Sequence, residues 1–72
     1  MEIEESTKES LFEYLDESFE ETDSKPTDGA VSRLINSYFL SLGSVRRDRQ
    51  LQAVGTNQEI VTNLIKEYKA KK

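Results

Sequence analysis

The chain has 72 residues, a length that fits one small domain over 1–72. It contains neither cysteine nor histidine, which excludes disulfides and the usual ligands of a structural zinc site. The same absence removes a thiol nucleophile and the commonest general base, and no serine lies in a nucleophile-elbow pattern, so we expect no enzyme activity, no metal and no cofactor.

Charge divides the chain into two parts. Residues 1–23 hold ten acidic side chains against Lys8, a net of −9, whereas residues 24–72 hold nine basic side chains against four acidic ones, a net of +5. Such polarisation is typical of surfaces that pair with each other, within a chain or between subunits, or that bind two partners. The alternative is a solvated acidic helix followed by ordinary basic helix ends.

Hydropathy argues against a membrane partner. The longest apolar run without a charge, 34–45, is interrupted by three serines, Asn36 and Gly43, which excludes a membrane span. Residues 1–5 are acidic where a secretory signal would be basic and then apolar. We therefore expect a cytoplasmic protein, with residues 1–5 and 69–72 frayed.

Periodicity and capping residues predict an all-α fold, a small compact bundle of three main helices plus one short helix. The first helix is expected over 6–21, opened by a capping box between Ser6 and Glu9. Its narrow apolar stripe consists of Leu11, Phe12, Leu15 and Phe19, and acidic residues fill its other faces.

The second helix, over 27–42, has the strongest pattern. Thr27 or Asp28 is its expected N-cap, directly after Pro26. Apolar residues then follow at i, i+3, i+4, i+7, i+8 and i+11, which gives a full amphipathic face. Gly43 is expected to end the helix in the left-handed conformation.

A shorter helix is expected over 44–54. Its apolar face is thin, and Arg46, Arg47 and Arg49 crowd its first turns, where positive charge opposes the helix dipole. Gly55 is expected to end this helix. Thr56 and Glu59 then form a second capping box, which opens the last helix over 56–70.

These stripes define an expected core from all four helices: Leu11, Leu15, Phe19, Val31, Leu34, Ile35, Tyr38, Phe39, Leu42, Leu51, Val54, Ile60, Val61, Leu64 and Ile65. Phe12, Tyr14 and Leu40 lie at or beyond the edges of the stripes. They are candidates for the contact surface of a homodimer, which would let a short chain bury additional surface. The alternative is that they are scattered exposed apolar residues without a partner.

Two sets of polar residues are candidates for binding, and the first lies on the first helix. Its acidic face would dock on a basic surface of a protein partner through Glu13, Asp16, Glu17, Glu20 and Glu21. The hypothesis that follows is a non-enzymatic small regulatory or adaptor protein, which binds another macromolecule, foremost a protein, through a charge-polarised helical surface. The alternative is that these carboxylates only solubilise a bundle helix.

The second set suggests nucleic acid. The short helix, Gly55 and the last helix have the outline of a helix-turn-helix over 44–70. Phosphates and base edges would be contacted by Arg46, Arg47, Arg49, Asn57, Gln58, Asn63 and Lys66. The alternative for the arginines is pairing with the acidic first helix. The net charge of −4 lacks the basic footprint of DNA-binding domains, so a DNA-binding transcriptional or replication regulator is the second hypothesis.

Overall fold

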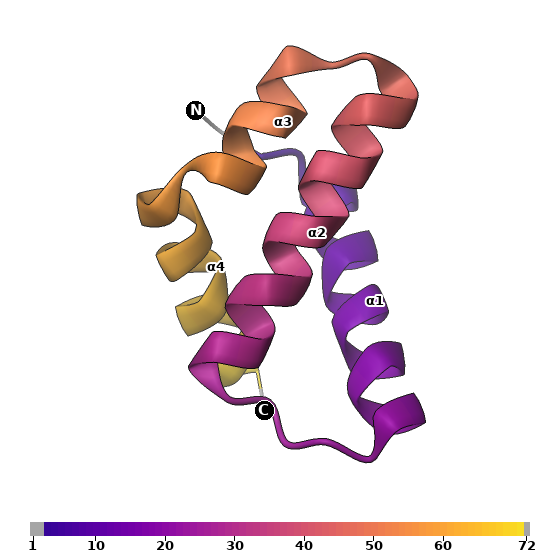
Figure 1. Ribbon diagram of the computed structural model, residues 1–72. Coiled ribbons are helices and arrows are strands. Elements are labelled where there is room, and N and C mark those ends of the chain that lie inside the picture. Colours follow the sequence, from indigo (N-terminus) through magenta and orange to yellow (C-terminus); the bar gives the residue numbers. More distant parts are fainter. Residues whose placement is uncertain (1–2, 72) are drawn as a thin grey trace.

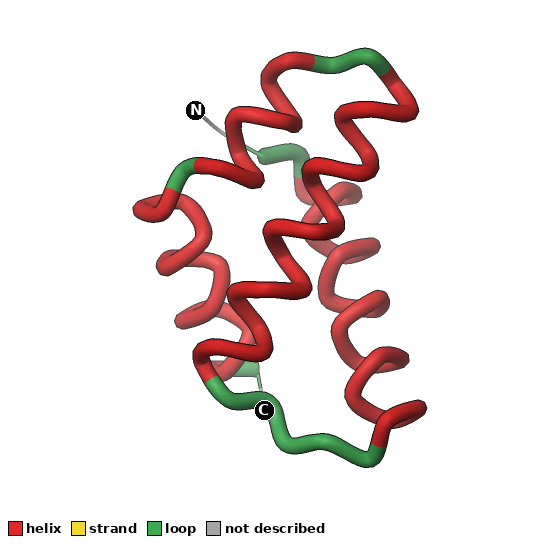
Figure 2. Tube along the Cα trace, viewed as in Figure 1, coloured by secondary structure: helices red, strands yellow, loops and turns green. Residues whose placement is uncertain are grey.

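The computed structural model describes residues 3–71, and every regular element among them is an α-helix (Figures 1 and 2). The four helices are α1 (Glu5–Thr22), α2 (Asp28–Arg46), α3 (Arg49–Thr56) and α4 (Gln58–Ala70). The expected all-α fold is therefore confirmed. The expected fraying of the two ends falls partly on residues 1, 2 and 72, which lie outside the described residues.

The central helix of the bundle is α2. In Figure 1 it runs between α1 and α4, antiparallel to α1, and α3 folds back beside its C-terminal half. Helix α2 contacts each of the other three helices, and its most extensive contact is with α3. The bundle measures 32 × 21 × 21 Å, and each of its helices has both buried and exposed residues.

The core lies where the four helices meet. Its buried apolar side chains are Leu11, Phe12, Leu15, Phe19, Val31, Ile35, Phe39, Val54, Val61, Leu64, Ile65 and Tyr68. All except Phe12 and Tyr68 belong to the core expected from the sequence. Five other residues expected in the core are only half-buried, because they flank the stripes that face the neighbouring helices: Leu34, Tyr38, Leu42, Leu51 and Ile60.

Phe12 was expected at a homodimer surface, but it is buried inside the monomer, so this prediction is wrong. Its ring centroid lies 5.5 Å from that of Tyr68, and the ring of Phe19 lies 6.4 Å from the same tyrosine. The Tyr68 hydroxyl donates a hydrogen bond of 2.7 Å to Oδ1 of Asp16. Helix α1 therefore packs against α4 as well as α2, and its buried residues are the four of the predicted stripe.

The beginnings of the first two helices differ in how they are capped. Helix α1 begins at Glu5, with Glu4 as N-cap and no side-chain cap bond, so Ser6 lies inside the helix and the predicted capping box is wrong. The acidic first turn itself interacts favourably with the helix dipole. The predicted cap of α2 is confirmed, because the Thr27 hydroxyl accepts a 3.3 Å hydrogen bond from the Ala30 N–H.

Gly43 does not end α2, as the sequence predicted, but lies buried inside it. The helix continues to Arg46, and Arg47 takes the left-handed conformation at a φ of 54°. A Cβ atom on Gly43 would lie 2.6 Å from Cγ of Gln52 and 2.8 Å from its backbone nitrogen. The role of this glycine is therefore to let α3 approach α2 closely. It does not form the left-handed turn that the sequence predicted.

Helix α3 spans Arg49–Thr56 and not the predicted 44–54, because residues 44–46 continue α2. The Asp48 carboxylate caps it by accepting hydrogen bonds from the N–H groups of Gln50 and Leu51. Gly55 lies buried within α3 and does not end it, and a Cβ on this glycine would lie 3.1 Å from Cγ of Leu40. Leu40, expected at a homodimer surface, therefore lies partly under α3.

The predicted capping box of α4 is also wrong. Asn57 is the N-cap, and its side-chain oxygen accepts hydrogen bonds from the N–H groups of Glu59 and Ile60. The Thr56 hydroxyl instead donates back to the carbonyl of Ala53, at 3.1 Å. The connection between α3 and α4 is thus the single residue Asn57, which follows the last residue of α3 and caps the N-terminus of α4.

Candidate protein-binding surface

The acidic face of α1 is exposed. We define it by the four glutamates whose side chains point away from the core: Glu13, Glu17, Glu20 and Glu21. On the opposite side of the helix, Leu11 and Leu15 are fully buried, which fixes the orientation of the face. Asp16, the fifth residue of the predicted set, differs from the others because it accepts the Tyr68 hydroxyl and so belongs to the contact between α1 and α4.

The acidic face carries unfavourable electrostatics. Glu13, Glu17 and Glu21 follow one another at i, i+4, a spacing at which like charges destabilise a helix by about 0.2–0.5 kcal/mol per pair. The last turn of α1 contains no basic residue, so carboxylates lie at the negative end of the helix dipole. A cationic surface laid on this face would relieve both effects.

The ion pairs among residues 3–71 use other carboxylates. Nζ of Lys8 lies 3.0 Å from Oε2 of Glu67 and 3.8 Å from Oε2 of Glu5, and Lys69 pairs with Asp28. The pairs that involve Glu67 and Asp28 connect α1 with α4 and α2 with α4, whereas the pair with Glu5 lies within α1. Within the described residues, neither the acidic face nor the arginines near α3 form a salt bridge. The arginines therefore do not pair with the acidic first helix, which was the alternative that the sequence left open.

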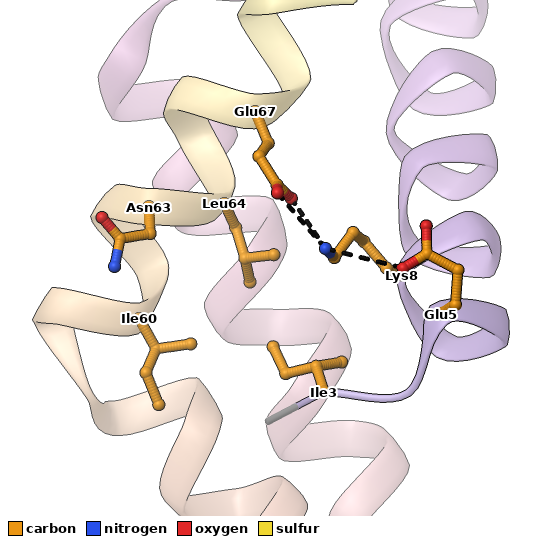
Figure 3. A pocket seen from close by; sticks show the side chains of 7 residues that line it. All are labelled: Ile3, Glu5, Lys8, Ile60, Asn63, Leu64 and Glu67. Carbon is orange, nitrogen blue, oxygen red and sulfur yellow. Dashed lines mark hydrogen bonds and ion pairs between the residues drawn. The ribbon is translucent and has the colours of Figure 1, made fainter. Parts of the chain in front are cut away.

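A groove of about 440 Å³ lies between the start of α1 and α4 (Figure 3). Three apolar side chains and four polar ones line it: Ile3, Ile60, Leu64, Glu5, Lys8, Asn63 and Glu67. In Figure 3 the Lys8 side chain extends from α1 towards Glu67, and their hydrogen bond raises the pKa of Lys8 above its ordinary value of 10.5. Both carboxylates of this groove pair with Lys8, which suits a structural connection between helices.

Sequence reasoning missed this groove, although a signal for it exists. Lys8 is the one basic residue of 1–23, and Glu67 is an acidic residue surrounded by lysines in the basic part. Two residues that each oppose the charge of their own segment are suited to pair with each other when those segments pack together.

The arginines predicted to hold phosphates lie at the corner between α2 and α3, and all three are exposed. Arg46 is in the last turn of α2, Arg47 follows that helix, and Arg49 is the first residue of α3. The prediction that they crowd one helix N-terminus is therefore wrong. Arg46 instead lies at a helix C-terminus, where positive charge interacts favourably with the dipole.

The other predicted nucleic-acid contacts lie apart from this corner. Asn57 is exposed but its side-chain oxygen caps α4. Gln58 and Lys66 line a groove that also contains Asp28, whereas Asn63 lines the groove that contains Lys8 and Glu67. The structure therefore distributes the seven predicted contacts over the α2–α3 corner, the junction between α3 and α4, and two separate grooves.

Comparison of the chain with protein-family models, with curated proteins and with solved structures found no match. Within residues 3–71, none of the helices combines the length and the apolar character that crossing a membrane requires. The assignment of function therefore rests on the surface of the molecule.

Proposed function

We propose that the protein is a non-enzymatic small regulatory or adaptor protein, which binds a basic surface of a protein partner through the acidic face of α1. The observation that carries this proposal is that Glu13, Glu17, Glu20 and Glu21 share an exposed face while the ion pairs of the described chain use other carboxylates. Partner binding supplies the positive charge that the fold does not bring to this face.

The scaffold supports recognition by a folded protein surface. The core holds α1 on two sides, through its contacts with α2 and through the aromatic cluster of Phe12, Phe19 and Tyr68. One α-helical turn rises about 5.4 Å, so carboxylates one turn apart present charges at a fixed spacing. Lysine or arginine side chains at the same spacing on a partner would meet them. Such complementarity chiefly accelerates association.

Affinity capture from cells that naturally make the protein tests the proposal. Three purified baits are compared: the wild type, a face variant with Glu13, Glu17, Glu20 and Glu21 changed to Gln, and a matched control with Glu4, Glu9 and Glu59 changed to Gln and Asp23 to Asn. Both variants lose four negative charges. We expect a partner that the wild type and the control retain and the face variant loses.

The proposal is contradicted if the same proteins are retained by all three baits, or if the wild type retains nothing beyond the bare resin. A retained protein is then purified and titrated against each bait, so that direct binding is separated from co-purification through a third component.

A further inference from the structure

An uncharged surface lies across α1 and α2, beside the acidic face. Its six residues are Tyr14 from α1 and Ser37, Tyr38, Ser41, Leu42 and Val45 from α2, which surround a hollow of about 240 Å³. We call it the tyrosine–serine surface. The rings of Tyr14 and Tyr38 lie 5.2 Å apart and join the two helices there.

This surface combines a projection with a depression. Val45 is 79% exposed, the most exposed large apolar side chain of residues 3–71. Ser37 and Ser41 lie one helical turn apart, and their short side chains leave room for a bulkier group. An uncharged, partly apolar surface of this kind can lie against a second copy of itself, as a two-fold symmetric interface requires.

Charge explains why a second copy fits here. The outer face of α1 is acidic, and the corner between α2 and α3 carries three exposed arginines, so either of these would repel its own copy. The tyrosine–serine surface has no charged member. Two copies can therefore meet on it without like-charge repulsion, although each chain has a net charge of −4.

The edges of the surface carry opposite charges. On α1, Glu17 and Glu21 follow Tyr14 by about one and two turns, and on α2, Arg33 precedes Ser37 by one turn. Because α1 and α2 are antiparallel (Figure 1), these acidic and basic edges lie towards the same end of the molecule. A two-fold axis running along the two helices, between them, exchanges the edges. It brings Arg33 of one copy to Glu17 and Glu21 of the other.

We infer that the protein forms a two-fold symmetric homodimer through the tyrosine–serine surface, with Arg33 of each copy facing the acidic edge of the other. Of the residues that the sequence suggested for a homodimer, only Tyr14 belongs to this surface. Since the surface is small, the dimer is weak. The inference does not depend on the proposed protein partner, because it concerns the purified chain alone.

Sedimentation equilibrium of the purified full chain, from about 1 μM to about 1 mM, tests this inference. Val45→Asp should raise the Kd by at least ~100-fold, because each dimer would bury two unpaired carboxylates. Ala53→Asp, the same charge change at an exposed position of α3, should leave the Kd within ~2-fold. Val45 is exposed, so both variants should keep the helical circular dichroism spectrum of the wild type.

Exchange of charges tests the orientation. Arg33→Glu should weaken the dimer by roughly 10-fold, and addition of Glu17→Arg should restore the Kd to within ~3-fold while the net charge returns to −4. A wild type that is monomeric over the whole range overturns the inference. So does a dimer that Val45→Asp leaves intact, or a double variant that is weaker than Arg33→Glu alone.

A second measurement uses the unmodified chain. Dilution across the dimer range should shift the amide resonances of residues 37–45 and of Tyr14 in the nitrogen–proton NMR spectrum. Shifts confined to α3 and α4 would place self-association on another surface and overturn the inference.

Discussion

Two glycines of α2 have opposite surroundings, and they should respond oppositely to the same substitution. A Cβ on Gly43 would lie 2.6 Å from Cγ of Gln52 and 3.0 Å from the carbonyl oxygen of Asp48, whereas a Cβ on Gly29 would meet nothing within 4 Å. We expect Gly43→Ala to destabilise the protein by about 1–3 kcal/mol through forced separation of α2 and α3. Gly29→Ala should stabilise it by about 0.5–1 kcal/mol.

Urea unfolding of the two alanine variants measures both effects. Equal changes in the free energy of unfolding at the two positions would mean that α3 does not approach α2 as closely as the structure shows.

The hydroxyl of Tyr68 makes a 2.7 Å hydrogen bond to Asp16 from a side chain that is only 2% exposed. Tyr68→Phe keeps the aromatic cluster and removes this bond, so it should cost about 1–2 kcal/mol. A double-mutant cycle with Asp16→Asn isolates the contribution of the pair. Fully additive losses would show that the hydrogen bond contributes nothing to stability.

The Lys8–Glu67 contact should make stability depend on alkaline pH. The hydrogen bond to Glu67 raises the pKa of Lys8 above 10.5 in the folded state, so the folded state binds the proton more tightly than the unfolded state does. The resulting stabilisation is complete below pH 10.5 and disappears as the pH rises through the raised pKa. The difference in unfolding free energy between wild type and Lys8→Met should therefore shrink above pH 10.5. A difference that stays constant to pH 12 would contradict this account of the contact.

At the scale of the element, α1 is a helix with favourable charges at its beginning and unfavourable ones at its end. Glu5 lies in the first turn and pairs with Lys8, whereas Glu21 lies near the C-terminus beside other carboxylates. Glu21→Lys should therefore stabilise the monomer by about 0.5–1 kcal/mol, and Glu5→Lys should destabilise it by a similar amount.

The two lysine variants have the same net charge, so their difference reports the position of the charge. Thermal unfolding at low ionic strength, in dilute solution, measures it. Stabilisation by both variants would indicate that overall net charge, and not the end of the helix, decides the stability of α1.

The sequence predicted those elements whose signal is local. The apolar period of α2 and the Thr27 cap depend on neighbouring residues only, and both agree with the structure. The ends of α2 and α3 were mispredicted because Gly43 and Gly55 serve the packing of one helix on another, a contact that no local pattern shows.

The same distinction applies to the candidate surfaces. The exposure of Glu13, Glu17, Glu20 and Glu21 follows from their place opposite the apolar stripe of α1, so periodicity was enough to predict it. The hydrogen bond of Asp16 to Tyr68 and the pairing of Lys8 with Glu67 each join residues more than fifty positions apart. Their detection requires the packing of α1 against α4.

At the scale of the whole molecule, the division of charge along the sequence becomes a division between faces. The acidic face of α1 and the arginine corner remain exposed, while isolated opposite charges such as Lys8, Glu67 and Asp28 tie the helices together. Charges that are opposite in sign to the rest of their segment therefore form ion pairs between helices. The acidic residues of the first segment and the arginines of the second stay on the surface, where they can meet another molecule.

The association rate constant of the protein with a captured partner tests the acidic face most directly. Stopped-flow or surface-plasmon measurements at several salt concentrations compare the wild type with the variant in which Glu13, Glu17, Glu20 and Glu21 are Gln. We expect the wild-type rate to fall steeply with salt, and the variant to associate about 10-fold or more slowly at low salt with a weak salt dependence. Equal rates and equal salt dependence for the two proteins would contradict recognition through the acidic face of α1.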